Sequence, residues 1–308
     1  MVQGRTLKNR MFDYLNIFLM SCLIVISFYP IYYAIINSFN TGNSILRGFS
    51  SFWPAEFSIE SWKTVIHDNA VIRAFFVTLS RTLIVTFGST LFTSMFAYAY
   101  SRPYLNGKKF YTTLGFVSMY FSGGVIPFFL LISRLNMYDS FWVYIIPSLF
   151  GGFYNVIIFN TNFKALPDSL FESAKLDGAS EFTIYSRIVM PLSKPVLAAL
   201  CVFTAVGVWN DYTATLYYTQ NPDLQTLQYY ILKLIRSFNA SEQLANSAMA
   251  NSAEIANLLS NARLGSGIVN SKTIELAAMV LSSIPMIIAY PFAQKYFVQG
   301  VLLGSVKE

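Results

Sequence analysis

Long apolar runs alternate with shorter polar segments along the whole chain. A helix that spans a bilayer needs about 20 predominantly apolar residues. Six runs meet this length: residues 13–37, 78–100, 110–133, 141–163, 195–217 and 274–297. The pattern therefore predicts an all-α, polytopic membrane protein with six transmembrane helices.

The first of these runs, 13–37, follows the basic residues Arg5, Lys8 and Arg10. Its apolar stretch is longer than the roughly 7–15 residues of a signal peptide, and no A-x-A cleavage pattern follows it. We therefore expect residues 13–37 to remain as the first span.

The composition agrees with a membrane location. Of the 308 residues, 55% are hydrophobic and 12% are charged, and the mean hydropathy is +0.49. About a quarter of the residues of an ordinary soluble chain are charged. This balance excludes a disordered chain and argues against a soluble two-domain protein. No linker or repeat is apparent, so a single transmembrane domain over residues 1–308 is expected.

Residue types that carry catalytic or metal-binding chemistry are scarce. Cys22 and Cys201 lie inside apolar runs and His67 is the single histidine, so no Cys/His zinc site or disulfide framework is expected. The apolar runs contain no cluster of acids such as a membrane enzyme or an ion-coupled transporter uses. The sequence also lacks a Gly-x4-Gly-Lys-Ser/Thr phosphate loop. We therefore expect no catalytic residue, no metal site and no ATP hydrolysis by that chemistry in this chain.

The positions of Lys and Arg near the span ends predict the orientation. More than half of these residues fall in segments that lie inside when the N-terminus is inside, among them Arg10, Arg102, Lys108, Lys164 and Lys295. The expected topology is N-in and C-in. The formal charge of +6 is spread over many segments, which argues against a nucleic-acid-binding patch.

Two connections are longer than simple turns. Residues 164–194 form a polar inner loop, and residues 218–273 form an external loop. Within the external loop, an Ala/Asn/Ser-rich stretch at about 240–263 contains helix formers and apolar residues. Short external helices are expected there.

The inner loop contains helix start and stop signals. Ser169-x-x-Glu172 is a capping box, in which two side chains satisfy free N–H groups at a helix start. Gly178 stands where a helix commonly ends in the left-handed conformation. Asp177 or Ser180 can then cap a second short helix. Its expected apolar face consists of Phe182, Tyr185, Ile188 and Val189.

Pro191 is expected to end this second helix before the next span. Short helices are marginal alone in water, so the pair must pack against something. The residues alone leave two interpretations open. Either the pair caps the inner end of the helix bundle, or it presents a rigid surface to a soluble cytoplasmic partner.

A longer motif runs through the same loop. Glu172-Ser173-Ala174-x3-Gly178-x9-Ile188-x-Met190-Pro191 resembles the EAA loop of ATP-binding-cassette importer permeases, in the MetI-like branch of the maltose-type sugar importers. Ser173 and Met190 depart from the usual Ala and Leu but keep the helix and its packing. Trp209-Asn210-Asp211 and the stretch from Gln294 to Gly300 resemble the same family. The resemblance implies a permease core at residues 73–297.

The resemblance further implies a permease subunit that forms a heterodimer with a second permease and binds two cytoplasmic ATPase subunits. Those ATPases would hold the ATP and Mg²⁺, and this chain would bind no cofactor. An extracellular or periplasmic solute-binding protein would deliver the substrate, in a bacterial cytoplasmic membrane. No nucleic acid is expected as a partner.

The family's coupling role carries over to the matching positions of this loop. Glu172 would pair with a basic residue of the ATPase, Ala174 would allow close approach, and Gly178 would permit the turn between the helices. The tail from Gly300 to Glu308 either reaches between the ATPase subunits or is a frayed terminus. The candidate ATPase-coupling residues are Glu172, Ser173, Ala174, Asp177, Gly178, Ile188 and Pro191.

Charges inside spans usually face a cavity or a partner. We expect Arg81 and Glu275 to reach the outer interface, whereas Asp211 lies deeper and either faces a polar cavity or makes a helix–helix hydrogen bond. Sugar binding uses aromatic faces together with hydrogen-bonding groups. The candidate substrate-pathway residues are therefore Trp209, Asn210, Asp211 and Tyr212.

The sequence thus predicts a permease subunit of an ATP-driven sugar or oligosaccharide importer, which forms half of the translocation pathway and is not itself an enzyme. Basic residues on the outer side are compatible with an acidic oligosaccharide. The alternatives are an importer permease for another small solute and a secondary transporter.

Overall fold

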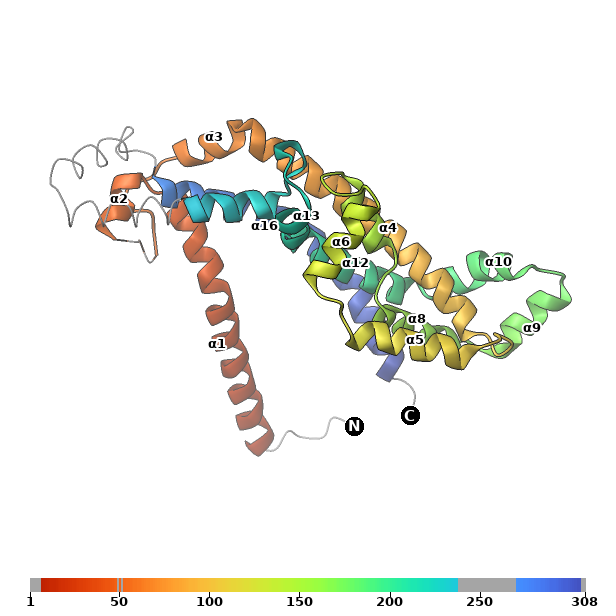
Figure 1. The fold of residues 1–308 in the computed structure, drawn as a ribbon. Coiled ribbons are helices and arrows are strands. Elements are labelled where there is room, and N and C mark those ends of the chain that lie inside the picture. Colours follow the sequence, from red (N-terminus) through yellow and green to blue (C-terminus); the bar gives the residue numbers. More distant parts are fainter. Residues whose placement is uncertain (1–6, 49, 51, 238–269, 306–308) are drawn as a thin grey trace. The chain divides into compact units, whose positions relative to one another are not determined.

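The computed structural model describes residues 7–48, 50, 52–237 and 270–305, and these residues are almost entirely helical (Figure 1). The β pairing within this part of the chain is one isolated bridge between Asn40 and Phe57. The predicted all-α class is therefore confirmed for the described residues. They divide into two compact units: residues 1–69 with 231–283, and residues 70–230 with 284–308.

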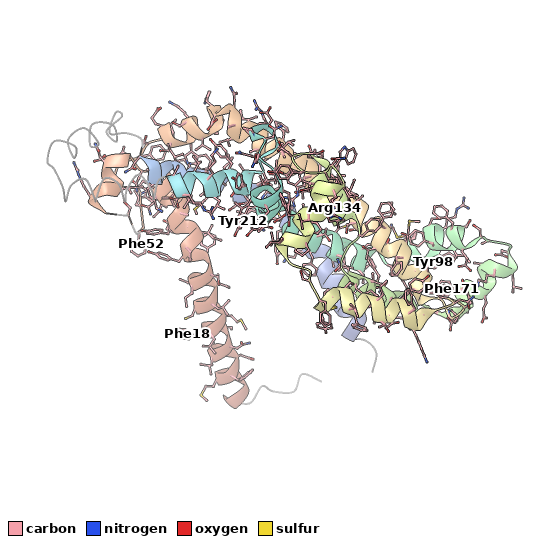
Figure 2. All side chains as sticks on the ribbon, viewed as in Figure 1. Phe18, Phe52, Tyr98, Arg134, Phe171 and Tyr212 are labelled. Carbon is pink, nitrogen blue, oxygen red and sulfur yellow. The ribbon has the colours of Figure 1, made fainter. Side chains whose placement is uncertain are left out.

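The first unit contains α1 (Leu7–Ser38), α2 (Gly42–Arg47), α3 (Glu60–His67) and the first part of α16 (Ser271–Ser305). Helix α1 is apolar and largely uncovered, and Phe18 projects from it with 63% of its surface exposed (Figure 2). A helix that faces lipid needs this surface. Near the C-terminal end of α1, Asn37 donates its side-chain amide to the Ser50 carbonyl at 2.8 Å. Elsewhere in this unit, Ser61 donates to Thr273 at 2.6 Å.

Helix α4 (Asn69–Ser101) is the long element of the second unit. Its buried face is made of small and hydroxylated residues that repeat at helical spacing, including Thr78, Thr82, Ser89, Thr93 and Ala97. Small residues allow close approach of helices inside a membrane, where hydrocarbon burial gives no preference for a large side chain.

Glycines permit the same close approach elsewhere in the second unit. A Cβ built on Gly115 would lie 2.4 Å from the ring of Phe153, and one on Gly151 would lie 2.6 Å from the Thr93 hydroxyl. Neither position has room for a larger residue. These contacts hold α5 and the break after α7 against their neighbours.

Two predicted spans each consist of two helices that meet at an angle. Helices α5 (Lys108–Tyr120) and α6 (Val125–Arg134) meet at 113°, and α7 (Trp142–Leu149) and α8 (Phe153–Lys164) meet at 44°. The first break ends at Gly124, whose φ of +84° lies in a region that favours glycine. The predicted continuous helix over 110–133 is therefore interrupted at residues 121–124.

The six predicted spans agree with the structure in number when each bent pair is counted as one span. Three helical stretches are long and apolar enough alone, Met11–Ser38, Asn69–Ser101 and Lys272–Pro291, and three bent pairs raise the count to six in the described residues. Helix α4 begins at Asn69, before the predicted residue 78. The N-in, C-in orientation, the single domain and the core bounds of 73–297 stay predictions.

The fifth span is shorter than predicted. Helix α12 (Lys194–Asn210) ends at Asn210, and α13 (Thr213–Tyr218) starts after a break, so the expected helix over 195–217 is wrong at its outer end. Asp211 lies in this break with extended backbone angles, and its carboxylate accepts the Thr213 N–H at 2.9 Å.

Part of the predicted external loop 218–273 is helical. A short 3₁₀ turn, Pro222–Leu224, precedes a helix over residues 227–237. The stretch 240–263, for which short helices are predicted, lies outside the described residues. Helix α16 reaches Ser305, and the last three residues of the predicted tail also lie outside.

Candidate functional site

The predicted inner loop 164–194 folds as a helical hairpin beside the end of α4 (Figure 1). Helix α9 (Asp168–Leu176) and helix α10 (Glu181–Ile184) form its two arms. A π turn at Tyr185–Val189 and helix α11 (Met190–Leu192) continue from α10, and the chain bends by 82° before α12. We call residues 168–192 the coupling hairpin.

The predicted capping box at the start of α9 is wrong. The helix starts at Asp168, Pro167 stands in the cap position, and no side-chain cap hydrogen bond forms. Ser169 and Glu172 therefore lie inside the helix. Pro167 has extended backbone angles, as is usual for the residue before a helix. The Asp168 carboxylate lies in the first turn, where the helix dipole favours a negative charge.

The stop at Gly178 is confirmed. Its φ of +77° is left-handed, and the Ala179 N–H donates to the Ala174 carbonyl at 2.9 Å while the Gly178 N–H donates to the Lys175 carbonyl at 3.0 Å. This is the Schellman pattern of helix ends. A Cβ at Gly178 would meet nothing within 4 Å, so the backbone angle, not a lack of space, requires glycine here.

Ser180 caps α10 as predicted, because its hydroxyl accepts the Thr183 N–H at 3.2 Å. The apolar face is predicted less well. Phe182 is 66% exposed, whereas Ile184 is fully buried together with Tyr185 and Val189. In the π turn the Met190 N–H donates to Tyr185, five residues back, which widens the helix and changes the side-chain register.

Pro191 lies within α11, and the helix runs one residue further, to Leu192. Pro191 has no N–H and so cannot continue the regular hydrogen-bond pattern. Its position next to the π turn and the 82° bend fits the predicted role of a helix breaker before α12.

The inner side of the coupling hairpin packs on an arginine at the end of α4. Arg102 is only 8% exposed, and its guanidinium lies 3.9 Å from the centre of the Phe171 ring and 4.6 Å from that of Tyr98. Figure 2 shows Tyr98 and Phe171 at this end of the second unit. A desolvated contact of this kind contributes about 2 kcal/mol.

Glu181 binds the second arm of the hairpin to the same end of α4. Its carboxylate accepts the Tyr98 hydroxyl at 2.6 Å and the Tyr104 hydroxyl at 2.5 Å, and it pairs with Lys175 at 3.2 Å. Burial and the hydrogen bond to Glu181 raise the pKa of Tyr104, and the bond to Glu181 raises the pKa of Lys175. Tyr104 is therefore neutral and Lys175 charged at physiological pH.

Helix α9 also has an uncovered side. Leu176 is 89% exposed, and the exposed Glu172 and Ser173 lie on the same helix. Phe182 is 66% exposed but lines a pocket together with Tyr98, Arg102 and Tyr104, on the side of the contacts just described. An exposed large apolar side chain beside a carboxylate is suited to contact with another protein. We call Glu172 and Leu176 the exposed face.

The predicted coupling residues therefore separate into two groups. Glu172, Ser173, Asp177, Gly178 and Pro191 are exposed, whereas Ala174 is buried and Ile188 is half-buried against the core of the second unit. A small residue at position 174 allows the hairpin to approach its own helix bundle.

The predicted substrate-pathway residues have different surroundings. Trp209 is 2% exposed and meets the Phe75 ring edge-on with 5.9 Å between centres. Asn210 bonds back to the Val206 carbonyl, and Tyr212 is 40% exposed. Their role in a pathway stays a prediction.

Asp211 forms a buried ion pair with Arg81 of α4. Arg81 is 2% exposed, donates to both the carboxylate and the carbonyl of Asp211, and lies 4.8 Å from the centre of the Tyr144 ring. The expectation that Arg81 reaches the outer interface is therefore wrong. Of the two interpretations of Asp211, the structure shows the helix–helix bond.

The same expectation for Glu275 is wrong. Its side chain is 5% exposed and pairs with the half-exposed Lys272, with the nitrogen 2.9 Å from the carboxylate oxygen. The pairing with a lysine one turn earlier neutralises the buried carboxylate.

Comparisons with known proteins identify the family to which this chain belongs. Residues 2–303 match the family described as binding-protein-dependent transport system inner membrane component. The chain belongs to this family. It is therefore a multi-pass membrane permease of the ATP-binding-cassette transport type, which is a transport subunit.

The chain is 33% identical over 302 residues to Protein LplC of Bacillus subtilis (strain 168), and the match covers 98% of this chain and 97% of that protein. It is 32% identical to the polygalacturonan/rhamnogalacturonan transport system permease protein YtcP of the same organism, over 98% of this chain and 100% of YtcP.

A crystal structure of a bacterial ABC transporter involved in the import of the acidic polysaccharide alginate has a similar chain. Its TM-score to this chain is 0.81 with 27% identity, and the match covers 96% of this chain and 100% of that one.

Sequence reasoning missed Arg102, Tyr104 and Glu181 as parts of the site. Arg102 counted only as a positive charge near a span end. An arginine directly after a long apolar run that ends in Tyr98 and Tyr100 is a weak signal, and only the fold brings it to Phe171, 69 positions later.

Proposed function

We propose that this chain is a permease subunit of an ATP-driven importer of a sugar or oligosaccharide. It would form half of the translocation pathway and pair with a second, different permease in a bacterial cytoplasmic membrane. Two ATPase subunits on the inner side would hold the ATP and Mg²⁺, and a solute-binding protein on the outer side would deliver the substrate.

One observation carries the coupling part of this proposal. The coupling hairpin presents Glu172 and Leu176 outward, while Phe171 contacts Arg102 directly after α4 and Glu181 accepts the hydroxyl of Tyr98 on α4. A surface that is apolar on one side and bound to a long helix on the other can transmit a push. Closure of the ATPase dimer against the exposed face would then shift α4 and change access to the pathway.

The rival interpretation, in which the hairpin only caps the bundle, explains the contacts of its inner side but not the exposed apolar side chain on its outer side. A cap has no need to leave Leu176 89% exposed. The exposed face therefore favours a docked partner. Membership of the family excludes the secondary-transporter alternative, and an importer of another small solute remains the second candidate.

The substrate class is supported by what similar proteins carry. YtcP is named for polygalacturonan and rhamnogalacturonan, and the similar crystal structure concerns alginate, which is acidic. We propose an oligosaccharide with acidic sugars, delivered from a binding protein, with Trp209, Asn210, Asp211 and Tyr212 near the path that it takes.

A reconstituted complex with its binding protein tests the substrate. The probes are trigalacturonate as the acidic ligand and raffinose as the neutral one. Stimulation of ATP hydrolysis by trigalacturonate alone supports an acidic oligosaccharide, and stimulation by raffinose alone overturns the acidic assignment. If neither stimulates, the small-solute candidate replaces the oligosaccharide.

A variant pair tests the coupling role in the same complex. Glu172→Ala removes a charge from the exposed face and should lower ligand-stimulated ATP hydrolysis about tenfold, the size expected for loss of one interfacial charge pair of about 1.4 kcal/mol. Glu60→Ala removes a half-exposed carboxylate from α3, outside the coupling hairpin, and should leave the rate unchanged. Equal rates in both variants would argue against docking at Glu172.

A further inference from the structure

A buried arginine in the second unit has an unusual set of neighbours. Arg102 is 8% exposed, and no ion pair of its guanidinium is observed among the residues that the structure describes. Its Nε donates to the Ser101 hydroxyl at 3.2 Å, and the planar group lies over the faces of Phe171 and Tyr98. A buried charge with no carboxylate is costly, so the two ring faces carry much of its stabilisation.

The two ring contacts join different elements. Tyr98 lies in the last turn of α4, four residues before Arg102, and Phe171 lies on the buried side of α9. The Tyr98 hydroxyl also donates to Glu181 at the start of α10. Both arms of the coupling hairpin are thus bound to the end of α4, α9 through Arg102, which directly follows the helix, and α10 through Tyr98 in its last turn.

Helix α4 leads from this turn to the Arg81–Asp211 ion pair without a break. From Tyr98 to Arg81 the helix covers 17 residues, which is about 25 Å at 1.5 Å per residue. A displacement of the hairpin that moves the end of α4 therefore reaches the break between α12 and α13, where the predicted pathway residues lie.

We infer that Arg102 is a positioning residue for transport: it joins the coupling hairpin to α4, so that a movement of the hairpin becomes a movement of the helix. This inference rests on the proposed coupling function. Arg102 touches neither the exposed face nor the pathway residues, and acts through Phe171 and Tyr98. Its planar group, and not its charge alone, is required, because an ammonium has no flat face to lie between two rings.

Distances between spin labels on the hairpin and on α4 test the joint. Cys22 and Cys201 are first replaced by Ala, and labels are placed at Ser169→Cys on α9 and Leu91→Cys on α4, which are both exposed. The complex with its ATPases and second permease is measured in nanodiscs. The native pair should give one narrow distance distribution.

Arg102→Met keeps an apolar chain of similar length and should broaden this distribution at least twofold. Arg102→Lys keeps the charge and should broaden it as well. Arg134→Met changes an exposed arginine of α6 in the same way and should leave it narrow. A narrow distribution in Arg102→Met overturns the inference, and so does full rescue by Arg102→Lys.

A second label pair measures transmission. Leu83→Cys on α4 and Tyr217→Cys on α13 are exposed and report on the other end of the helix. Trapping the ATPases with ATP and vanadate should shift this distance in the native complex, and Arg102→Met should reduce the shift at least twofold. An equal shift in Arg102→Met overturns the inference.

Two further outcomes are decisive. If the native complex shows no shift on trapping, the proposed coupling function fails. The width of the distance distribution between the labels at positions 169 and 91 still tests whether Arg102 joins the hairpin to α4. If Arg102→Met does not assemble, Phe171→Leu takes its place, because it removes one ring face and keeps an apolar side chain. A narrow distribution in Phe171→Leu then overturns the inference, and a broad one supports it.

Discussion

Two buried arginines, one within helix α4 and one directly after it, are stabilised in different ways. Arg81 pairs with the Asp211 carboxylate and lies over the Tyr144 ring, whereas Arg102 lies over two aromatic rings and has no ion pair among the described residues. An ion pair with two donors has a fixed geometry, while the attraction of a guanidinium to ring faces is less directional.

The difference suits the two ends of the helix. At the Arg81 end the bonds run from α4 to the break between two helices and fix the geometry there. At the Arg102 end, the proposed coupling function requires the hairpin to stay attached to α4 when a partner moves it. The comparison can be tested by breaking each end separately, and the expected effects are largest at Arg81.

Asp211→Ala should give the largest loss of stability. It leaves Arg81 buried without a carboxylate, which costs about 3–5 kcal/mol. Thermal unfolding followed by circular dichroism in detergent should show a lower midpoint. The double variant Arg81→Met/Asp211→Leu removes both charges and should regain most of the loss. A single variant as stable as the native chain would show that the pair contributes nothing.

Phe171→Ala should have the next largest effect. The side chain is 6% exposed, and the removal of a buried phenylalanine costs about 3–5 kcal/mol, to which the lost contact with Arg102 belongs. Because the ring lies at one end of the second unit, we expect a loss of unfolding free energy near the lower limit of this range. Phe182→Ala removes an exposed ring from the same hairpin and should change the free energy of unfolding by less than about 0.5 kcal/mol. Similar losses in both variants would contradict the assignment of inner and outer sides.

Gly178→Ala should cost about 1 kcal/mol, because its φ of +77° strains a residue with a Cβ. Gly207 provides a matched control inside α12, where a Cβ also meets nothing within 4 Å. Gly207→Ala should stabilise by up to about 1 kcal/mol, since alanine is the better helix former. Unfolding midpoints that move in the same direction for both variants would contradict this explanation.

Lys175→Met should have the smallest effect, since the Lys175–Glu181 pair is half exposed. The pKa of Lys175 is raised in the folded chain, so its contribution is complete below the ordinary lysine value of about 10.4 and is lost as the pH rises through the higher folded value. The width of the Ser169–Leu91 label distance should therefore be constant from about pH 7 to 9. Broadening within that interval would contradict the assigned direction.

Local signals predicted much of the hairpin. Gly178 and Ser180 act through neighbours within five residues, so their roles are visible in the sequence. The start of α9 was predicted wrongly because Pro167 competes with Ser169 for the same role. Of the expected apolar face of the second helix, Tyr185 and Val189 are buried and Ile188 is half-buried, whereas Phe182 is exposed.

The two arginine sites could not be predicted from local signals. Arg81 and Asp211 are 130 positions apart, and Arg102 and Phe171 are 69 positions apart, so only the helix packing brings them together. Hydropathy identified the spans but placed Arg81 at an interface, because the pattern along one helix carries no information about its partner. The bends at residues 121–124 and after Asn210 likewise require the fold.

Binding of the purified ATPase to the permease pair in nanodiscs tests the central claim, that the coupling hairpin is the docking site, most directly. Leu176→Asp places a charge on the exposed face without disturbing the core, and Leu135→Asp places the same charge on an exposed leucine after α6. We predict that Leu176→Asp weakens binding at least about thirtyfold, the effect of a hot-spot residue worth about 2 kcal/mol. Leu135→Asp should bind like the native chain, and equal affinity for all three would contradict the account.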